Sequence, residues 1–255
     1  MLDTIALPGL TRVWKMNGLS QNEKNSRGES SGRRPVRSYV LRGGRLTAGQ
    51  ERALRELWPR FGIENGDGLL DLELLFGNSA PVIMEIGFGN GEATWRMAGA
   101  HPEETFIAVE VHRPGVGHLL LKIEEHAIGN IRIACADATE FLRARIPENS
   151  LDGIRIYFPD PWPKKRHHKR RIIQPAFVRA LVSRMRTGAI LHLATDWEPY
   201  AEYMLEVLGS VDGLVNLSSS GGYCDKPGWR PETKYEKRGE RLGHEVKDLL
   251  FAKEP

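Results

Sequence analysis

The sequence has few cysteines, no long apolar run and little net charge. Cys135 and Cys224 are its only cysteines and no CxxC motif occurs, which argues against a structural zinc site or a disulfide framework. No apolar segment approaches the roughly 20 residues of a membrane span. The N-terminus lacks the basic and then apolar pattern of a secretory signal. These absences predict a cytoplasmic protein without a bound metal or a membrane anchor.

Positive charge is unevenly distributed along the chain. The formal net charge is only +3, yet basic residues concentrate in the first 45 residues and in the segment 164–171. Such a distribution is typical of proteins that bind nucleic acid or another polyanion. Residues 1–35 are polar and rich in Gly and Ser, which predicts a disordered tail. Residues 36–255 are predicted to form one domain.

From residue 81 onward, strand patterns alternate with helix patterns. Strands are predicted at 82–86, 105–111, 130–136, 151–158 and 189–195, with a helix after each, and a final antiparallel strand within 244–253. This alternation predicts an α/β, Rossmann-like fold with a mostly parallel, doubly wound sheet. Before this region, Thr47 is predicted to cap a helix that begins at Ala48.

A glycine turn follows the first predicted strand. Gly87, Gly89 and Gly91 lie between this strand and a helix, a context typical of nucleotide-cofactor sites. No Lys or Arg occurs within 82–91, and Glu85 lies at the end of the strand. A buried carboxylate disfavours a pyrophosphate and favours a ligand with positive charge, such as S-adenosylmethionine. A nicotinamide-dependent dehydrogenase is the less favoured alternative.

Acidic residues also end the next three predicted strands: Glu110, Asp137 and Asp160. The carboxyl ends of parallel strands meet at one edge of the sheet, where ligands bind. Glu110 could accept hydrogen bonds from ribose hydroxyls. Asp137 could accept one from the adenine amino group, directly or through a neighbouring backbone group. A single acid at such a position can instead cap the following helix.

The segment YFPDPWPKKRHHKRR, residues 157–171, joins an acid, an indole and a basic run. The prolines at 159, 161 and 163 predict extended backbone at the residues before them, Phe158, Asp160 and Trp162. Asp160 and Trp162 would then be held stiffly at the edge of the sheet. The basic run that follows is either a solvated charge run or a surface for phosphates.

Five segments together resemble the bacterial tRNA (guanine-N7-)-methyltransferase family: EIGFGNGE, VEVHRPGVG, FPDPWPKKRHHKRR, ATDW and TKYEKRGERLGH. The resemblance covers residues 37 to 255. It implies a class I methyltransferase fold and transfer of a methyl group from S-adenosylmethionine to N7 of the guanine at position 46 in the tRNA variable loop (EC 2.1.1.33). Three residues differ from the family pattern: Pro163, His168 and Tyr235 stand where His, Asn and Phe are usual.

The resemblance also implies roles for individual residues. It assigns the cofactor to Glu85, Glu110, Asp137 and Asp160, beside the glycines of the turn, and makes Asp160 the catalytic residue. Its substrate-binding positions are Lys164, Asp196, Thr233, Lys234, Tyr235 and Glu236. Its RNA-contacting positions are Arg166, His167, His168, Lys169, Arg170 and Arg171. The implied partner is tRNA, and we expect a monomer or a weak homodimer.

The chemistry of guanine N7 limits what the site must do. N7 carries a lone pair and no proton, so positioning should matter more than a general base. We expect Asp160 to orient guanine and to stabilise the positive charge that develops on its ring. Trp162 either stacks on the base or packs beneath the loop. The remaining alternatives are a methyltransferase for another base or a small molecule, and a non-catalytic RNA-binding module.

Overall fold

The computed structural model describes residues 38–39, 44–233, 236–237 and 243–255. The chain divides into two units, Met1–Pro35 and Val36–Pro255, and all described residues belong to the second. The tail predicted at 1–35 lies outside the described residues, as do Lys234 and Tyr235.

An eight-stranded sheet forms the centre of the described unit, with the strand order β1-β4-β3-β2-β5-β6-β8-β7. The strands from β1 to β6 pair in parallel, and β8 pairs antiparallel with both β6 and β7. The predicted fold class, with an antiparallel C-terminal strand, is therefore confirmed. The strands are β1 (Gly62–Ile63), β2 (Val82–Ile86), β3 (Thr105–Val109), β4 (Ile131–Ala134), β5 (Leu151–Tyr157), β6 (Met185–Thr195), β7 (Leu214–Asn216) and β8 (Lys247–Lys253).

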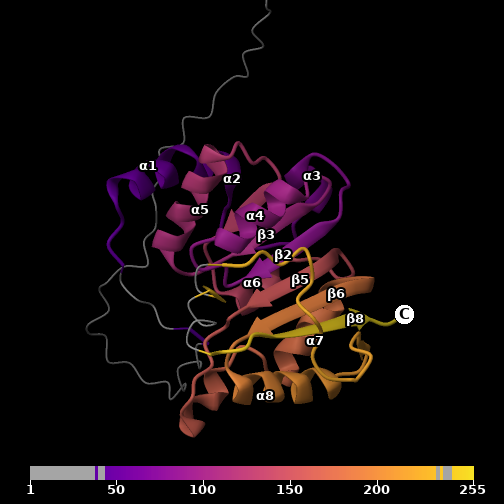
Figure 1. Ribbon diagram of the computed structural model, residues 1–255. Coiled ribbons are helices and arrows are strands. Elements are labelled where there is room, and N and C mark those ends of the chain that lie inside the picture. Colours follow the sequence, from indigo (N-terminus) through magenta and orange to yellow (C-terminus); the bar gives the residue numbers. More distant parts are fainter. Residues whose placement is uncertain (1–37, 40–43, 234–235, 238–242) are drawn as a thin grey trace, which may run out of the picture. The chain divides into compact units, whose positions relative to one another are not determined.

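Helices cover both faces of the sheet (Figure 1). One hydrophobic cluster holds residues of α1, α4 and α5, and a second holds residues of α6, α7 and α8. The sheet is thus doubly wound, because its helices lie on two sides. The helices are α1 (Ala48–Glu56), α2 (Trp58–Phe61), α3 (Leu72–Phe76), α4 (Glu92–Ala100), α5 (Arg113–Glu125), α6 (Ala138–Arg145), the 3-10 helix η1 (Lys165–Arg170), α7 (Pro175–Arg184) and α8 (Glu198–Gly209).

Helix α1 begins as the sequence predicts. The Thr47 side chain accepts a hydrogen bond from the Gln50 backbone N–H, and the Gln50 side chain accepts one from the Thr47 N–H. This reciprocal pair satisfies two N–H groups that the first helical turn leaves free. The Gln50 amide also donates to the Pro114 carbonyl at 3.1 Å. The cap therefore also fixes α1 against α5.

The backbone after β5 differs from the extended geometry predicted for it. Phe158 and Trp162 have φ values of 49° and 45°, in the left-handed region, so the prediction is wrong for these two residues. The Phe158 N–H donates to the Ala194 carbonyl at 2.8 Å, which holds the strand end while the chain turns away. The Trp162 indole donates to the Ser38 carbonyl at 3.2 Å. Tertiary contacts of this kind outweigh a local cost of about 1–3 kcal/mol per residue.

None of the helices in the described part of the chain is long and apolar enough to cross a membrane.

Candidate active site

The glycine turn between β2 and α4 approaches α5 closely. Gly87, Gly89 and Gly91 all have positive φ, between 60° and 77°, a region that glycine adopts without steric cost. A Cβ on Gly91 would lie 2.8 Å from the Leu119 side chain, and one on Gly115 would lie 1.9 Å from the Gly89 carbonyl oxygen. The positive φ values favour glycine at all three positions of the turn, and the close packing against α5 also excludes a side chain at Gly91 and at Gly115.

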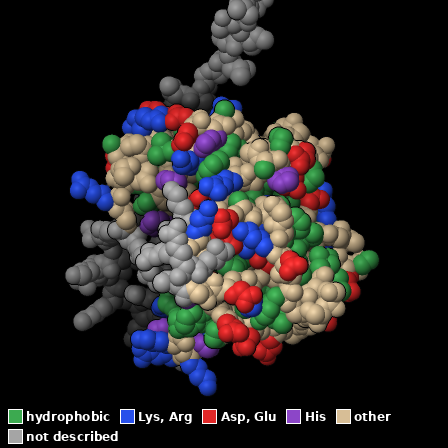
Figure 2. Space-filling view, viewed as in Figure 1, with side chains coloured by type: hydrophobic (Ala, Val, Ile, Leu, Met, Phe, Trp, Pro, Cys, Tyr) green, Lys and Arg blue, Asp and Glu red, His purple; other side chains and the backbone are tan. Residues whose placement is uncertain are grey.

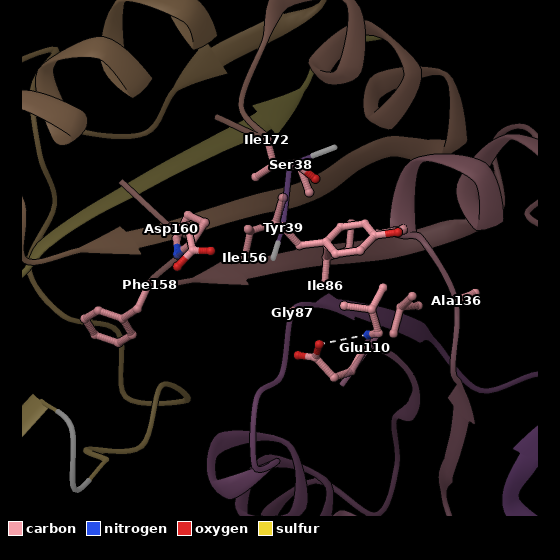
Figure 3. Close-up of a pocket in the computed structure, with 14 residues that line it drawn as sticks. Ser38, Tyr39, Ile86, Gly87, Glu110, Ala136, Ile156, Phe158, Asp160 and Ile172 are labelled. Carbon is pink, nitrogen blue, oxygen red and sulfur yellow. Dashed lines mark hydrogen bonds between the residues drawn. The ribbon is translucent and has the colours of Figure 1, made fainter. Parts of the chain in front are cut away.

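A first cavity of about 210 Å³ lies where β2, β3, β4 and β5 end. Its lining includes Glu110, Asp160, Phe158 and, from the N-terminal segment, Ser38 and Tyr39. In Figure 3 the carboxylates of Glu110 and Asp160 and the ring of Tyr39 border the same space. The edge of the sheet chosen from the sequence thus brings together two of the predicted acids.

Glu110 is held by three backbone donors. Its Oε1 accepts from the N–H groups of Val111 at 2.8 Å and His112 at 3.0 Å, and its Oε2 accepts from Gly89 at 2.9 Å. A carboxylate offers about four acceptor sites, so one remains for a ligand. The Glu110 carboxylate is therefore pre-oriented and ties the glycine turn to the end of β3.

Asp137 instead caps α6. Its Oδ1 accepts from the N–H groups of Thr139 and Glu140 at 2.8 and 3.1 Å. Ala136 and Ala138, on either side, line the first cavity, whereas Asp137 is absent from the lining that the structure describes. The capping alternative thus accounts for this carboxylate, and a role in cofactor binding stays a prediction.

Asp160 lies between two prolines and is exposed. Its carboxylate makes no hydrogen bond with the described residues, in contrast to Glu110, whose bond is drawn in Figure 3. An exposed carboxylate without an internal partner is available to a ligand. Among the predicted acids, Asp160 is therefore the one whose carboxylate is most accessible to a substrate.

A second cavity of about 460 Å³ adjoins the first. Gly87 and Phe158 line both cavities, so the two meet at the glycine turn. Other residues of the second cavity are Glu85, Asp196, Arg230, Thr233 and His244. Two cavities that meet at one turn can hold two ligands side by side.

Glu85 is a buried acid in the wall of the second cavity. Its exposed fraction is 2%, and its Oε2 has no hydrogen-bond partner in the described structure. Burial raises the pKa of Glu85 to about 7, and the Thr94 side chain and the nearby Arg155 charge oppose this rise. Because an unpaired buried carboxylate is costly, a ligand with positive charge near Glu85 would be favoured.

The predicted substrate-binding residues fall into two groups. Asp196 and Thr233 line the second cavity, and the Asp196 carboxylate lies 3.8 Å from His244 Nδ1. Lys164 is exposed but lines neither cavity among the residues described. The side chain of Glu236 is only 1% exposed and is paired with Lys226 and Arg230. Direct contact between Glu236 and a substrate does not fit this arrangement.

The basic run forms η1 and not a loose loop. Lys165, Arg166 and Lys169 are exposed, and Figure 2 shows Lys, Arg and His side chains gathered at the lower end of this view, where Figure 1 draws η1. Burial and the surrounding cations hold the pKa of His167 below its usual value. This run offers a compact positive surface to a polyanion.

Arg171 differs from the rest of the basic run. It is 4% exposed, its Nε donates to the Pro161 carbonyl at 3.0 Å, and its guanidinium lies over the rings of Tyr200 and Tyr203. In this arrangement Arg171 has no surface to offer RNA. The two rings that cover it come from α8, so the sequence of the basic run could not reveal its burial.

Trp162 packs beneath the loop. Its indole donates to Ser38, the Arg170 guanidinium lies 4.7 Å from its ring, and His167 meets it edge-on at 5.9 Å. Trp162 is absent from the described lining of both cavities. Of the two alternatives for this residue, the geometry favours packing over stacking on a base.

Several residues of the site were not identified from the sequence. Phe158 and Tyr39 line cavities, and Arg230 lines the second cavity while it pairs with Asp248, which also pairs with His192. Asp248 interrupts an apolar strand, which was a usable sign of a buried, paired charge. No cluster of three or more His, Cys, Asp or Glu that could hold a metal ion occurs among the described residues.

Comparison with known proteins gives consistent results. Residues 79–249 match a family model described as "Putative methyltransferase". The chain is 55% identical to a tRNA (guanine-N(7)-)-methyltransferase of Alcanivorax borkumensis, covering 86% of this chain and 92% of the relative. It is 53% identical to the enzyme of that name from Alkalilimnicola ehrlichii, covering 88% and 95%. The fold is similar to a crystal structure of the 16S rRNA methyltransferase KamB, with a TM-score of 0.55, 16% identity and coverage of 77% and 99%.

Proposed function

Since the chain belongs to the tRNA (guanine-N(7)-)-methyltransferase family, we propose that it transfers a methyl group from S-adenosylmethionine to N7 of a guanine in tRNA. The observation that carries the proposal is identity above 50% over most of both chains. We further propose that the target is the guanine at position 46, in the variable loop. The two adjoining cavities support a reaction between two bound ligands.

The residues present fit S-adenosylmethionine. The glycine turn leaves room for close approach of a ligand, and Glu110 keeps one acceptor site for a ribose hydroxyl. The unpaired oxygen of buried Glu85 suits a nearby positive charge. When bound, S-adenosylmethionine supplies the electrophilic methyl group. We assign it to the first cavity, with Gly87 at the boundary and Glu85 beyond it in the wall of the second.

The second cavity then receives the guanine. Asp196 and Thr233 contribute a carboxylate and a hydroxyl to its wall, and Phe158 contributes an aromatic ring where the cavities meet. Aromatic side chains often stack on RNA bases that are turned out of their helix. A base in this cavity would lie next to the glycine turn and hence next to the methyl donor.

Asp160 has two roles in this proposal. Asp160 lines the first cavity, two residues after Phe158, which lines both. From there its exposed carboxylate can accept hydrogen bonds from guanine N1–H and N2–H₂, donors that adenine does not present in this pattern. It also stabilises the positive charge that the purine ring gains when N7 is methylated. No proton leaves N7, so Asp160 orients the base and is not required as its general base.

The exposed cations of η1 bind the RNA backbone. Lys165, Arg166 and Lys169 can contact phosphates, which gives affinity that depends on salt and carries little sequence information. Because Asp160 and η1 belong to one continuous segment, phosphate contacts at η1 would hold the target base near the cavities.

One experiment tests this function directly. The protein is incubated with methyl-labelled S-adenosylmethionine and unmodified tRNA, and the RNA is then cleaved chemically at 7-methylguanine. We expect label and cleavage at position 46, and neither in a matched tRNA with adenine at that position. Label in adenine, or transfer only to a small molecule, would contradict the proposal.

A further inference from the structure

Arg230 lies in the wall of the second cavity and is 2% exposed. Its Nε and Nη2 donate to the two oxygens of Asp248 on β8, at 2.7 and 2.8 Å. Its Nη1 donates to Glu236 at 2.8 Å. One guanidinium therefore joins the last long strand of the sheet to the segment that follows Thr233.

The charges around Arg230 are balanced. Glu236 also accepts from Lys226 at 3.0 Å, and Asp248 accepts from His192 Nε2 at 2.7 Å. His192 Nδ1 accepts from the Trp229 indole, so its proton is on Nε2, and burial lowers its pKa. Two acids thus face two cations and a neutral histidine. Removal of one partner would leave a buried charge unpaired, which is strongly unfavourable.

The ion pairs around Arg230 fix the position of Thr233 through Glu236. The Thr233 N–H donates to the Glu236 carboxylate at 3.4 Å, and its hydroxyl accepts from the Glu236 N–H at 3.3 Å. On the other side, Arg96 of α4 donates to the Glu232 carbonyl at 3.1 Å. The segment 230–233 is therefore attached both to the sheet through Asp248 and to α4 through Arg96.

We propose that Arg230 is a positioning residue for the acceptor base. By binding Asp248 and Glu236 together, it fixes Thr233 in the wall of the second cavity that Asp196 also lines. Glu236 then acts through Arg230 and Thr233, without touching the guanine. The proposal rests on the proposed function, because it takes the second cavity as the guanine site.

A double-mutant cycle tests whether Glu236 acts through Arg230. Arg230→Lys keeps the positive charge but cannot span two carboxylates, and Glu236→Gln keeps the side-chain shape. Loss of one charge-assisted hydrogen bond should raise KM for tRNA by about 10- to 100-fold in each variant. The Kd for S-adenosylmethionine, measured by calorimetry, should change less than about twofold, because neither residue lines the first cavity.

The double variant decides between the two roles of Glu236. If Glu236 acts through Arg230, the double variant has about the KM of the worse single variant, since coupled residues are not additive. If the two effects multiply, Glu236 contacts the substrate independently and the proposal is wrong. A wild-type protein that methylates no guanine would overturn the proposed function itself.

A milder variant covers the case in which Arg230→Lys does not fold. Arg96→Leu removes the support from α4 at a side chain that is 41% exposed, so the fold should persist. We expect KM for tRNA to rise with an unchanged Kd for the cofactor. An unchanged KM would show that the position of segment 230–233 does not matter. Arg55→Leu, at another exposed arginine on a helix, is the matched control.

Discussion

Asp160 and Glu85 both lie at the carboxyl edge of the sheet, but one is exposed and the other is buried. Asp160 is exposed and makes no hydrogen bond with the described residues, whereas Glu85 is buried with one unpaired oxygen. Exposure leaves the Asp160 carboxylate accessible to a substrate, whereas burial raises the pKa of Glu85. The two residues should therefore respond differently to substitution.

Replacement of Asp160 by alanine should abolish most methyl transfer. We expect kcat to fall by about 10²- to 10³-fold, the usual cost of losing one electrostatic contact to the transition state. Because Asp160 lines the first cavity, cofactor binding should weaken but remain measurable, since Glu110 and the glycine turn are unchanged. Single-turnover rates and calorimetry measure the two quantities. The control is Asp212→Ala, at an exposed aspartate between α8 and β7. Near-normal turnover of Asp160→Ala would exclude Asp160 as the residue that orients and stabilises the guanine.

The buried carboxylate of Glu85 should make stability depend on pH. Its pKa rises from 4.5 to about 7 on folding, so the folded state binds the proton more tightly. Stability without cofactor then falls as pH rises from about 4.5 to 7, by about 3 kcal/mol in total. Glu85→Gln removes this loss, so its Tm should exceed that of the wild type at pH 8 and match it at pH 4.5. An equal difference at both pH values would exclude titration of Glu85 as the cause.

Side chains within one motif can have different functions that the motif does not reveal. The sequence placed Glu236 and Arg171 among residues that contact the substrate, yet both side chains are buried against partners outside their motifs. Their burial depends on Arg230, Tyr200 and Tyr203, which lie outside the motifs. Sequence reasoning found which residue types gather at the site but not which of them the fold leaves exposed.

At the scale of elements, the longer strands and helices were predictable because their apolar patterns span several residues. β1, β7 and α3 contain two, three and five residues, too few for a clear period. η1 was unexpected because its six residues contain no apolar position. The left-handed residues Phe158 and Trp162 arise from contacts with Ala194 and Ser38, which no local rule contains.

The surface of η1 should govern the salt dependence of RNA binding. Replacing Lys165, Arg166 and Lys169 together by Gln should weaken tRNA binding. The slope of log K against log salt should become shallower by about 2 to 3, near one unit per lost phosphate contact. Filter binding at several salt concentrations gives the slope. As a control, we replace three arginines that are exposed on α1, α6 and α7, namely Arg55, Arg143 and Arg179, by Gln; this should leave the slope nearly unchanged. An unchanged slope in the η1 variant would locate the RNA surface elsewhere.

Trp162 connects η1 to the wall of the first cavity. Trp162→Phe keeps an aromatic ring but loses the hydrogen bond to Ser38, which is worth about 1 kcal/mol. We expect the Kd for S-adenosylmethionine to rise about fivefold, because Ser38 and Tyr39 line that cavity. Calorimetry measures this change. Unchanged cofactor affinity with weaker tRNA binding would instead favour stacking of Trp162 on a base.

At the scale of the whole molecule, the order of the sheet explains why the site lies where it does. β2 pairs in parallel with both β3 and β5, so the order of successive strands in the sheet reverses beside β2, where open α/β sheets bind ligands. The alternation of strands and helices sufficed to predict this edge. The division of the edge into two cavities depends on segment 230–233 and Ser38–Tyr39, whose positions follow from long-range contacts.

The meeting of the two cavities at Gly87 and Phe158 has a kinetic consequence. Neither Cys135 nor Cys224 lines either cavity in the described structure, so no thiol is placed to carry a methyl group from one cavity to the other. We therefore expect donor and acceptor to occupy the protein together in a ternary complex. Double-reciprocal plots of initial velocity should give intersecting lines, whereas the parallel lines of a ping-pong scheme would indicate a methylated enzyme intermediate.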